Sequence, residues 1–571
     1  MSIAHRNTPP KELSYLKSKL YNAGYIRDDL LDLLDNHYYY YEIICNFIIQ
    51  SSTSLGELLN KLLMKNLLLL LTLFLSALVL QAQSHLPCGT PAGKSEWLKA
   101  YQANPNLYKV DPNNMMYVAM TNHVLGQDNG SGYPRIDFLL ESFCQLNQDF
   151  LPSNIQFYMT LPFNYIDNSA WYQHSTVIEG ADMMNANNIP NTINSYFVND
   201  PAGTAGYNLP HADGVALSTF VTGTGDHTWA HEIGHNLSVQ HTFLGWEGNT
   251  YDFNAPTPTE VYYDYTLFKD TLILDTIIID TALVEMVPRT NCYVSGDGFC
   301  DTPPDYISVR WPCDADSLSF TVQKDPNNVQ FKSDGTNYMS YAYDQCQNKF
   351  TPEQIAAMRA NLMSEKPGTI ATQPPVSGPV NQPVSLLSPI GGQNVQFDAV
   401  TLEWAAVPNA THYILQVNRL SSFPGSQMVV NQIVSDTFAF VSTLNNSWTF
   451  YWKVMPFNVV STCQPFGAVE TFATTVLADI GEVATVDSWS VTPSLCTVGK
   501  QVTVTLENTA LLDGQLSIFS LSGVKVFSQN VIVESGTTEI QLDTEQWGSG
   551  MYLVTLETEN GRAIKKLVLT D

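Results

Sequence analysis

The sequence predicts a multidomain chain in which a mixed α/β domain, with a twisted sheet and an active-site helix, is followed by two all-β sandwich domains. The 571 residues are too many for one domain, since about 150 residues per domain is typical. A Pro- and Gly-rich stretch at 367–383 divides the chain, and beyond it the helical period gives way to short runs with period two. With 44% hydrophobic residues, there is enough apolar material for packed cores.

The acidic balance narrows the possible partners. The formal net charge is −28 and is spread over the chain without long acidic runs. Nucleic acids and anionic membranes bind basic patches, so neither is an expected partner. We expect the acidic side chains to serve solubility and to offer oxygen ligands for calcium.

A secretory signal is predicted in the sequence MKNLLLLLTLFLSALVLQAQS, which begins at Met64. It has a positive residue at Lys65, an apolar stretch over 67–80 and the small residue Ala82 at the expected cleavage point. An apolar stretch of about 14 residues is shorter than the roughly 20 that cross a bilayer. We therefore expect a secreted or cell-surface protein whose mature chain has no stable membrane span.

The domain boundaries follow from these features. Signal peptides begin at an initiator methionine, so we expect Met64 to be the true start and residues 1–63 to be a mis-assigned N-terminal extension. A genuine cytoplasmic extension is the alternative. The other predicted boundaries are 64–82 for the signal peptide, 83–110 for a short prosegment, 111–366 for the α/β domain, 367–384 for a linker, 385–475 for the first sandwich, 476–494 for a second linker and 495–571 for the last sandwich.

The motif HEIGHNLSVQH, from His231 to His241, predicts a metal site. Residues four apart lie on one face of a helix, so His231 and His235 are expected to bind one zinc ion with Glu232 beside them. His241 cannot reach the same ion on a continuous helix, so a sharp turn is expected before it. Three histidine ligands leave the fourth zinc position to water, which is the arrangement of a catalytic site.

A second segment, GTNYMSY at 335–341 followed by DQCQNKFTPEQIAAM, accompanies this motif. Together the two segments resemble the pappalysin (cytophagalysin) family of metzincin zinc metalloendopeptidases. The resemblance covers residues 111–365 and includes DGVALS at 213–218, HTF after the last histidine, and GDGFCDTPPD at 296–305.

The resemblance implies an α/β metzincin fold, zinc held by the three histidines, and Glu232 as general base. Glu232 is expected to accept a proton from a water on the zinc and to deliver it to the leaving amine. Met339 is expected in a turn beneath the zinc, as a packing residue. Tyr341 is expected near the metal, as a ligand or as a hydrogen-bond donor to the transition state, and an ordinary buried tyrosine is the alternative.

One position departs from the family pattern HExxHxxGxxH. Ser238 stands where the pattern has glycine. Glycine adopts a positive φ freely, whereas serine in that conformation is strained by on the order of 1–2 kcal/mol. Ser238 is therefore the position at which the sequence indicates an altered or weakened site.

The helix after the second segment has clear start signals. Thr351 is expected as the N-cap, Pro352 as the first helical residue, and Gln354 as the partner of Thr351 in a capping box.

The predicted function is that of a secreted zinc endopeptidase that hydrolyses peptide bonds in proteins. Two alternatives belong to other classes: a weakly active or inactive surface adhesin built on the same fold, and an enzyme that hydrolyses small amides. The intact Glu232 argues against the adhesin. The sequence indicates neither the substrate preference nor the role of the insertion at 245–291.

Four cysteines flank the predicted zinc region, and the resemblance implies two disulfides among them. Four cysteines allow three pairings. The resemblance favours Cys292–Cys313 with Cys300–Cys346.

The resemblance also implies structural calcium in the loop at 296–305. Asp297, Asp301 and Asp305 are the candidate oxygen ligands. The alternative is that these aspartates are merely solvated.

Cys88, in the sequence LPCGT behind the signal, suggests a latency switch. The resemblance includes proenzymes whose prosegment cysteine occupies the catalytic zinc, and a thiolate is a strong zinc ligand that displaces the attacking water. The alternative is a disulfide between Cys88 and Cys144.

Residues 385–475 resemble a fibronectin type III domain. The matching segments are LEW ending at Trp404, HYILQV at 412–417 and YWKV at 451–454. In such a sandwich Trp404 is a core residue. We expect this domain to be a spacer, and an adhesive module that binds a matrix component or a carbohydrate is the alternative.

The last predicted domain, 495–571, resembles the C-terminal sorting domain of type IX secretion. The resemblance rests on LSIFSLSGVKVFSQ at 516–529, SGMYLVTLE at 549–557 and GRAIKKLVL at 561–569. It implies the type IX secretion machinery as a partner and export through the outer membrane of a Gram-negative bacterium. A further small sandwich with no special role is the alternative.

Overall fold

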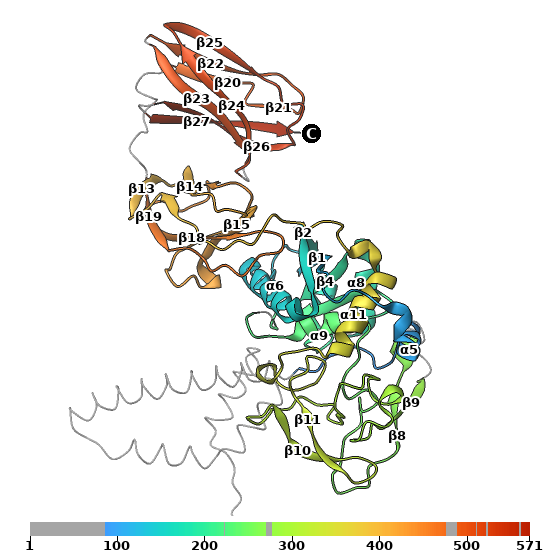
Figure 1. Ribbon diagram of the computed structural model, residues 1–571. Coiled ribbons are helices and arrows are strands. Elements are labelled where there is room, and N and C mark those ends of the chain that lie inside the picture. The colour runs from blue at the N-terminus through green and yellow to red at the C-terminus, as the bar shows by residue number, and fades with distance from the viewer. Residues whose placement is uncertain are drawn as a thin grey trace, which may run out of the picture. The chain divides into compact units, whose positions relative to one another are not determined.

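A computed structural model describes residues 86–221, 223–269, 277–475, 488–509, 511–520, 523–558 and 561–570. The predicted extension at 1–63 and signal peptide at 64–82 lie outside the described residues. Along the chain, the described residues form an α/β unit and then two β-sandwiches, as the sequence predicts (Figure 1).

The α/β unit is built on a five-stranded sheet with the strand order β2-β1-β4-β7-β6. Strands β1, β2, β4 and β7 are parallel, and β6 is an antiparallel edge strand. Parallel strands need crossover connections, which here carry the helices α6 and α8. The bounds are Met116–Gly126 for β1, Ile155–Asp167 for β2, Ile193–Val198 for β4, Gly206–Leu209 for β6, Gly214–Ser218 for β7, Ile136–Phe150 for α6 and Val177–Asn187 for α8.

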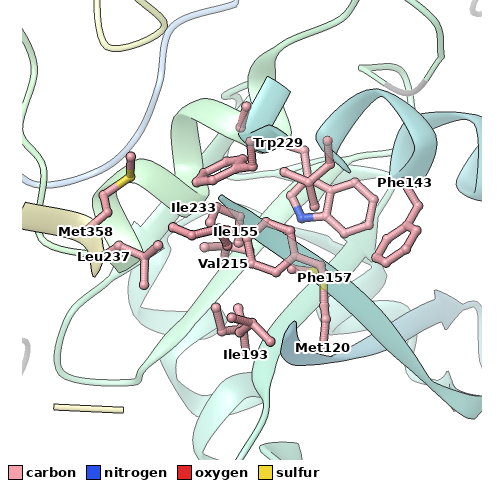
Figure 2. Packing of buried hydrophobic residues seen from close by; sticks show 14 of the residues in the cluster. Met120, Phe143, Ile155, Phe157, Ile193, Val215, Trp229, Ile233, Leu237 and Met358 are labelled. Carbon is pink, nitrogen blue, oxygen red and sulfur yellow. The ribbon is translucent and has the colours of Figure 1, made fainter. Parts of the chain in front are cut away.

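The main core of this unit packs α6, α9 (Thr228–Asn236) and α11 (Pro352–Ser364) against the sheet (Figure 2). Phe143 of α6, Phe157 of β2 and Ile233 of α9 are fully buried in it. Burying a large apolar side chain contributes about 1.5–3 kcal/mol. The core therefore holds α9, the helix that carries two of the predicted zinc ligands, in one position on the sheet.

Helix α11 begins as the sequence predicts. Thr351 accepts a hydrogen bond from the backbone of Gln354, the Gln354 side chain accepts one from the backbone of Thr351 at 2.9 Å, and Pro352 is the first helical residue. Further along α11, the buried guanidinium of Arg359 donates to backbone carbonyls of two loops. These carbonyls belong to Asp111, Asn114, Ser153 and Asn154.

Between α9 and α11 the chain has little regular structure. The insertion at 245–291 contains a hairpin of β8 and β9, and a second hairpin, of β10 and β11, follows it. The bounds are Glu260–Asp264 for β8, Thr266–Lys269 for α10, Ile279–Leu283 for β9, Cys292–Val294 for the 3-10 turn η3, Leu318–Lys324 for β10, Gln330–Asp334 for β11 and Asp344–Cys346 for η4.

The disulfide pairing in this region differs from the predicted one. Cys292 bonds Cys300, and Cys313 bonds Cys346, so the expected pairs Cys292–Cys313 and Cys300–Cys346 are wrong. Cys292 and Cys300 close a tight loop, with a sequence separation of 8. A bridge between Trp311 and Ala342 brings the segment before Cys313 alongside the one before Cys346.

The predicted prosegment is partly built into the α/β unit. Helix α5 (Glu96–Ala103) buries Leu98 and Tyr101 in the main core, and the Gln102 side chain donates to the Asp297 carbonyl at 2.8 Å. Upstream of α5, Cys88 pairs with Gly206 of β6 in a parallel bridge.

The second unit is a sandwich of a three-stranded sheet, β12-β14-β17, and a five-stranded sheet, β13-β19-β18-β15-β16. Trp404 is 2% exposed in its core, as predicted, and Val380 and Val384 of the predicted linker are buried in the same core. The strands are Leu386–Ser388, Gln393–Gln396, Val400–Trp404, His412–Asn418, Met428–Val434, Phe438–Val441, Thr449–Phe457 and Glu470–Thr475, from β12 to β19 in chain order.

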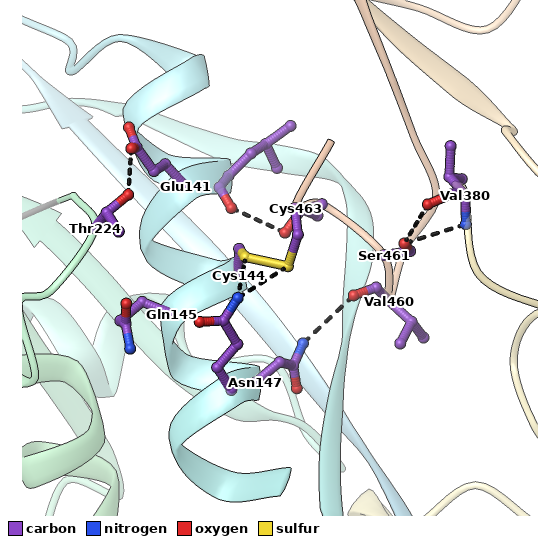
Figure 3. The surroundings of a disulfide bond; sticks show 12 residues. Glu141, Cys144, Gln145, Asn147, Thr224, Val380, Val460, Ser461 and Cys463 are labelled. Carbon is purple, nitrogen blue, oxygen red and sulfur yellow. Dashed lines mark hydrogen bonds between the residues drawn. A yellow bond between two sulfur atoms is a disulfide. The ribbon is translucent and has the colours of Figure 1, made fainter. Parts of the chain in front are cut away.

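A disulfide between Cys144 of α6 and Cys463 joins this sandwich to the α/β unit (Figure 3). It excludes the predicted alternative of a Cys88–Cys144 bond. Beside it, the Asn147 amide donates to the Val460 carbonyl, and the Thr462 hydroxyl donates to the Leu140 carbonyl at 2.8 Å. Phe457 and two further sandwich residues, Ile414 and Met455, are buried in the main core of the α/β unit.

The third unit is a sandwich of β20-β22-β25 and β21-β27-β26-β23-β24 with its own apolar core. Its strands are Ser488–Thr492, Leu495–Thr497, Val502–Asn508, Leu512–Ser520, Lys525–Val533, Gly536–Leu542, Gly550–Thr558 and Gly561–Thr570, from β20 to β27. Within the described ranges, no helix is long and apolar enough to cross a membrane.

Candidate metal centre

Helix α9 presents His231 and His235 one turn apart and ends at Asn236. The end of the helix is set by Ser238, which has a φ of 70°. In this left-handed conformation the Ser238 backbone N–H bonds the His235 carbonyl, and the Val239 N–H bonds the Gly234 carbonyl, both at 2.9 Å. The chain therefore reverses sharply where the sequence predicts a turn.

Ser238 adopts the strained conformation that its position demands, and it has a compensating contact. The Asn361 side chain of α11 donates a hydrogen bond to the Ser238 hydroxyl at 3.1 Å. A glycine at this position would be free of strain but would lack this bond.

The reversal brings the third histidine to the first two. The Nε2 atom of His235 lies 3.1 Å from the Nε2 of His231 and 3.1 Å from the Nε2 of His241. With the Cys88 sulfur, these nitrogens form a group of four ligand atoms that all lie within 4.8 Å of one another. It is the one such group of His, Cys, Asp or Glu side chains in the part of the chain that the structure describes.

The other ring nitrogen of each histidine has a hydrogen-bond acceptor. The Nδ1 of His231 lies 2.7 Å from the Tyr338 carbonyl, and that of His235 lies 2.9 Å from the Val239 carbonyl. The Nδ1 of His241 lies 3.0 Å from a carboxylate oxygen of Glu247. Because each Nδ1 faces an acceptor, the Nε2 atoms are the ring nitrogens that face one another.

This arrangement fits a metal ion. Burial lowers the pKa of His231 to about 3, and burial together with the neighbouring histidines lowers the pKa of His235, so both rings are neutral, as metal ligands must be. Nitrogen lone pairs that face one another in a buried place repel unless a cation lies between them. Zinc accepts three imidazole nitrogens and a thiolate in tetrahedral geometry.

Met339 packs directly beneath α9. It is fully buried, and a Cβ atom at Gly234 would lie 2.5 Å from its sulfur. Gly234 therefore gives the room that lets the Met339 side chain approach the helix backbone between the two histidines. A place for Met339 in a turn beneath a zinc ion stays a prediction.

Glu232 is completely buried beside the three histidines. One carboxylate oxygen accepts a hydrogen bond from the Thr90 hydroxyl at 2.8 Å, and the other has no hydrogen-bond partner among the described residues. Burial raises the pKa of Glu232 to about 7, although hydrogen bonds from Cys88 and Thr90 act in the opposite direction. A carboxylate with this pKa exchanges protons readily near neutral pH.

Tyr341 lies against the histidine cluster. Its ring centroid is 5.0 Å from that of His241, and its hydroxyl donates to the Cys88 carbonyl at 3.1 Å. Burial and the nearby Cys88 and Glu232 raise the pKa of Tyr341, so the phenol keeps its proton and stays a donor.

Residues around Cys88 run as an added strand along β6. The Gly89 N–H donates to the Gly206 carbonyl at 2.8 Å, and the Thr90 hydroxyl accepts the Asn208 N–H at 2.7 Å. Burial and the neighbouring Glu232 raise the pKa of the Cys88 thiol, whereas a bound metal ion would favour the thiolate. Cys88 forms no disulfide.

The three aspartates proposed for calcium have separate partners. Asp301 accepts a hydrogen bond from the Glu353 backbone at the start of α11, and Asp305 accepts from the hydroxyls of Thr242 and Ser333. Asp297 is completely buried, and one of its oxygens has no hydrogen-bond partner in the described ranges. Calcium binding in this loop stays a prediction.

Asp297 belongs to an acidic pair with Glu285, which is 3% exposed. Burial and the charge of Asp297 raise the pKa of Glu285 to about 9, and burial also raises the pKa of Asp297. The ammonium of Lys94, in the prosegment, interacts favourably with both carboxylates. Burial lowers the pKa of Lys94.

Thr90, Glu247, Lys94 and Glu285 are not among the predicted site residues. Thr90 and Glu232 are separated by 142 residues, so no local pattern connects them. Glu247 is six residues from His241, and a carboxylate this close to a predicted ligand was a usable signal.

Comparisons with known proteins identify the C-terminal unit. Residues 498–570 match the family described as secretion system C-terminal sorting domain. This match supports the predicted type IX sorting domain and the secretion machinery as a partner. The protein is therefore exported through the outer membrane of a Gram-negative bacterium to the cell surface or the extracellular space. No curated protein matches the chain at a significant level.

Solved structures match only in part. The chicken CNTN1 FN1–FN3 domains share 14% identity, cover 34% of this chain and 69% of their own, and give a TM-score of 0.15. The fibronectin(III)-like modules of Clostridium thermocellum CbhA share 10% identity, cover 33% of this chain and 94% of their own, and give a TM-score of 0.13. Latent PorU from Porphyromonas gingivalis shares 12% identity, covers 33% of this chain and 20% of its own, and gives a TM-score of 0.14. With TM-scores this low, the matches add nothing to the sandwich topology described above.

Two substitutions at Ser238 separate strain from bonding. Ser238→Ala keeps the strained backbone and loses the bond to Asn361, so we expect it to lower the free energy of unfolding by about 1 kcal/mol. Ser238→Gly loses the same bond but releases strain of similar size, so its free energy of unfolding should stay within about 1 kcal/mol of the wild-type value. Urea unfolding and zinc affinity check both. A more than tenfold gain in zinc affinity in the glycine variant would show that the strain weakens the site.

The buried pair of Glu285 and Asp297 makes stability depend on pH. The pKa of Glu285 is about 9 in the folded protein and about 4.5 in the unfolded chain. The contribution of this carboxyl to the free energy of unfolding is therefore fully present below about pH 4.5 and is lost as the pH rises towards 9. In calcium-free buffer, we expect Glu285→Gln to match the wild type in melting temperature at pH 5 and to exceed it at pH 8. The exposed Glu260→Gln is the control. The same dependence of melting temperature on pH in wild type and Glu285→Gln would contradict this expectation. A rise of the wild-type melting temperature when calcium is added at pH 8 would indicate that the acidic pair binds calcium.

Proposed function

We propose that the protein is a secreted zinc endopeptidase, of the pappalysin type of metzincin, that is exported in a latent form. The observation that carries the proposal is the convergence of three imidazoles at one point beside the buried carboxylate of Glu232. Zinc sites with three protein ligands and an open position are catalytic, whereas structural zinc sites are closed by four.

The side chains around the cluster suit peptide hydrolysis. Held by the three histidines, a zinc ion would supply a Lewis acid that lowers the pKa of a bound water to about 7. Glu232, with its pKa of about 7, accepts the proton of the attacking water and returns it to the leaving amine. Tyr341 is a neutral donor near the same point, and a donor there stabilises the oxyanion that forms on the peptide carbonyl.

Edge strand β6 suits the binding of an extended peptide. Residues 87–90 already pair with it through the backbone bonds Ala205 N to Pro87 O and Gly89 N to Gly206 O. An extended chain added to a sheet edge is held by its main chain, which every protein substrate has. Small amides lack such a backbone, so this edge favours proteins as the substrate class.

Latency follows from what occupies the cluster. Cys88 supplies a fourth ligand atom, and the Thr90 hydroxyl donates a hydrogen bond to the Glu232 carboxylate at 2.8 Å. In this form the Cys88 sulfur lies at the metal position that a water would take, and one of the two oxygens of the general base is already hydrogen-bonded to Thr90. Activation therefore requires residues 87–90 to leave β6.

A digest of casein or gelatin tests the activity. We expect the purified protein, after removal of the prosegment, to cleave casein, and we expect a chelator or Glu232→Ala to abolish the cleavage. Loss of the general base lowers the rate by about 10²–10⁴-fold or more. Glu260→Gln, on the exposed hairpin, is the matched control and should keep full activity. A protein that holds zinc but cleaves nothing would be the adhesin of the alternative hypothesis.

Cleavage by the unprocessed precursor tests the latency. Cys88→Ala should give the precursor clear activity, and Thr90→Val should give it weaker activity, because one hydrogen bond to a buried carboxylate is lost. Asn106→Ala, in an exposed part of the prosegment, is the control and should leave the precursor silent. A precursor that stays silent with Cys88→Ala, although its processed form cleaves casein, would contradict the switch.

A further inference from the structure

The hydrogen bonds of the three histidines differ in one respect. Those of His231 and His235 end on backbone carbonyls, whereas that of His241 ends on the side chain of Glu247. A carboxylate bound to the far nitrogen of an imidazole fixes the orientation of the ring and makes it a stronger electron donor to a metal. His241 is thus the histidine of the cluster whose support depends on a side chain.

Glu247 is itself held in a tight turn. Its second oxygen accepts the Gly245 N–H at 2.7 Å, so both carboxylate oxygens have a donor. The turn continues from the last histidine through backbone bonds from Leu244 N to the His241 carbonyl and from Trp246 N to the Phe243 carbonyl. The Phe243 ring stacks on the ring of His241 at 4.6 Å. The carboxylate and the aromatic ring therefore hold His241 from two directions.

The insertion at 245–291 packs against this turn. A Cβ atom at Gly245, where φ is 100°, would lie 2.5 Å from the Cβ of Ala282 in β9, so no other residue fits there without displacing the hairpin. The Asn249 side chain donates to the Gly245 carbonyl at 3.1 Å and to the Tyr262 carbonyl of β8 at 2.7 Å. The β8–β9 hairpin and the Glu247 turn are thus joined by a close contact and by hydrogen bonds.

From these contacts we infer that Glu247 is a positioning residue for the third metal ligand, and that the β8–β9 hairpin holds Glu247 in place. The inference rests on the zinc site of the proposed function. It gives the insertion a role in metal binding: the hairpin supports the turn, the turn presents the carboxylate, and the carboxylate orients His241. Glu247 acts through His241 and takes no part in proton transfer.

Zinc affinity of the metal-free protein tests the inference without reference to catalysis. The measurement is competition with a chromophoric chelator in the full secreted chain carrying Cys88→Ala, so that the thiol does not contribute. We expect Glu247→Ala to weaken zinc binding by about 10- to 100-fold and Glu247→Gln by about 10-fold, because the amide has a single acceptor for two donors. Asn249→Ala should weaken it by a smaller factor in the same direction. Glu260→Gln, which lies at the start of β8 and bonds Tyr262, should bind zinc as the parent does.

Two further measurements distinguish a role of Glu247 in positioning His241 from a role in the stability of the fold. Cobalt bound in place of zinc should show a changed visible spectrum in Glu247→Gln, because the spectrum reports the geometry of the ligands. The melting temperature of the metal-free protein should change little. Zinc affinities of Glu247→Ala and Glu247→Gln within twofold of the parent would overturn the inference, as would a lower melting temperature with an unchanged cobalt spectrum. A parent protein that binds zinc but cleaves no casein would refute the proposed function and leave this comparison valid.

Discussion

The convergence of three imidazole Nε2 atoms in a buried place is the constraint on which the α/β unit depends. The chain has to bring His241 back to α9 within six residues, and it does so through the left-handed backbone at Ser238. It has to keep each Nδ1 proton away from the centre, and it provides two carbonyls and Glu247 for this purpose. It also has to bring Met339 close to the helix, which the absence of a side chain at Gly234 permits.

The features that the sequence predicted correctly are those in which local spacing carries the information. The histidine spacing placed His231 and His235 on one helical face, and the capping residues Thr351 and Gln354 marked the start of α11. Contacts between distant segments leave no local pattern in the sequence and could not be predicted from it. The pairing of Cys313 with Cys346 depends on a bridge between two irregular segments, and the contact of Thr90 with Glu232 depends on which strand forms the sheet edge.

The predicted prosegment is attached to the α/β unit in two ways that differ in strength. Residues 87–90 make a short run of hydrogen bonds along β6, whereas α5 buries Leu98 and Tyr101 in the main core. Hydrogen bonds at a sheet edge exchange readily with those of another extended chain, and burial in a core does not. The site can therefore be uncovered by displacing residues 87–90 while α5 stays in place as part of the fold.

The join between the α/β unit and the first sandwich affects the order in which the protein can fold. The main core includes Phe457, and the Met159 N–H of β2 bonds the Val459 carbonyl. Cys144 and Cys463, which form the disulfide, are separated by 319 residues. A chain that emerges from the ribosome from its N-terminus cannot complete this core until synthesis is well past residue 460. The α/β unit therefore stays unfinished through most of translation, and the histidine cluster reaches its final form late in the synthesis of the nascent chain.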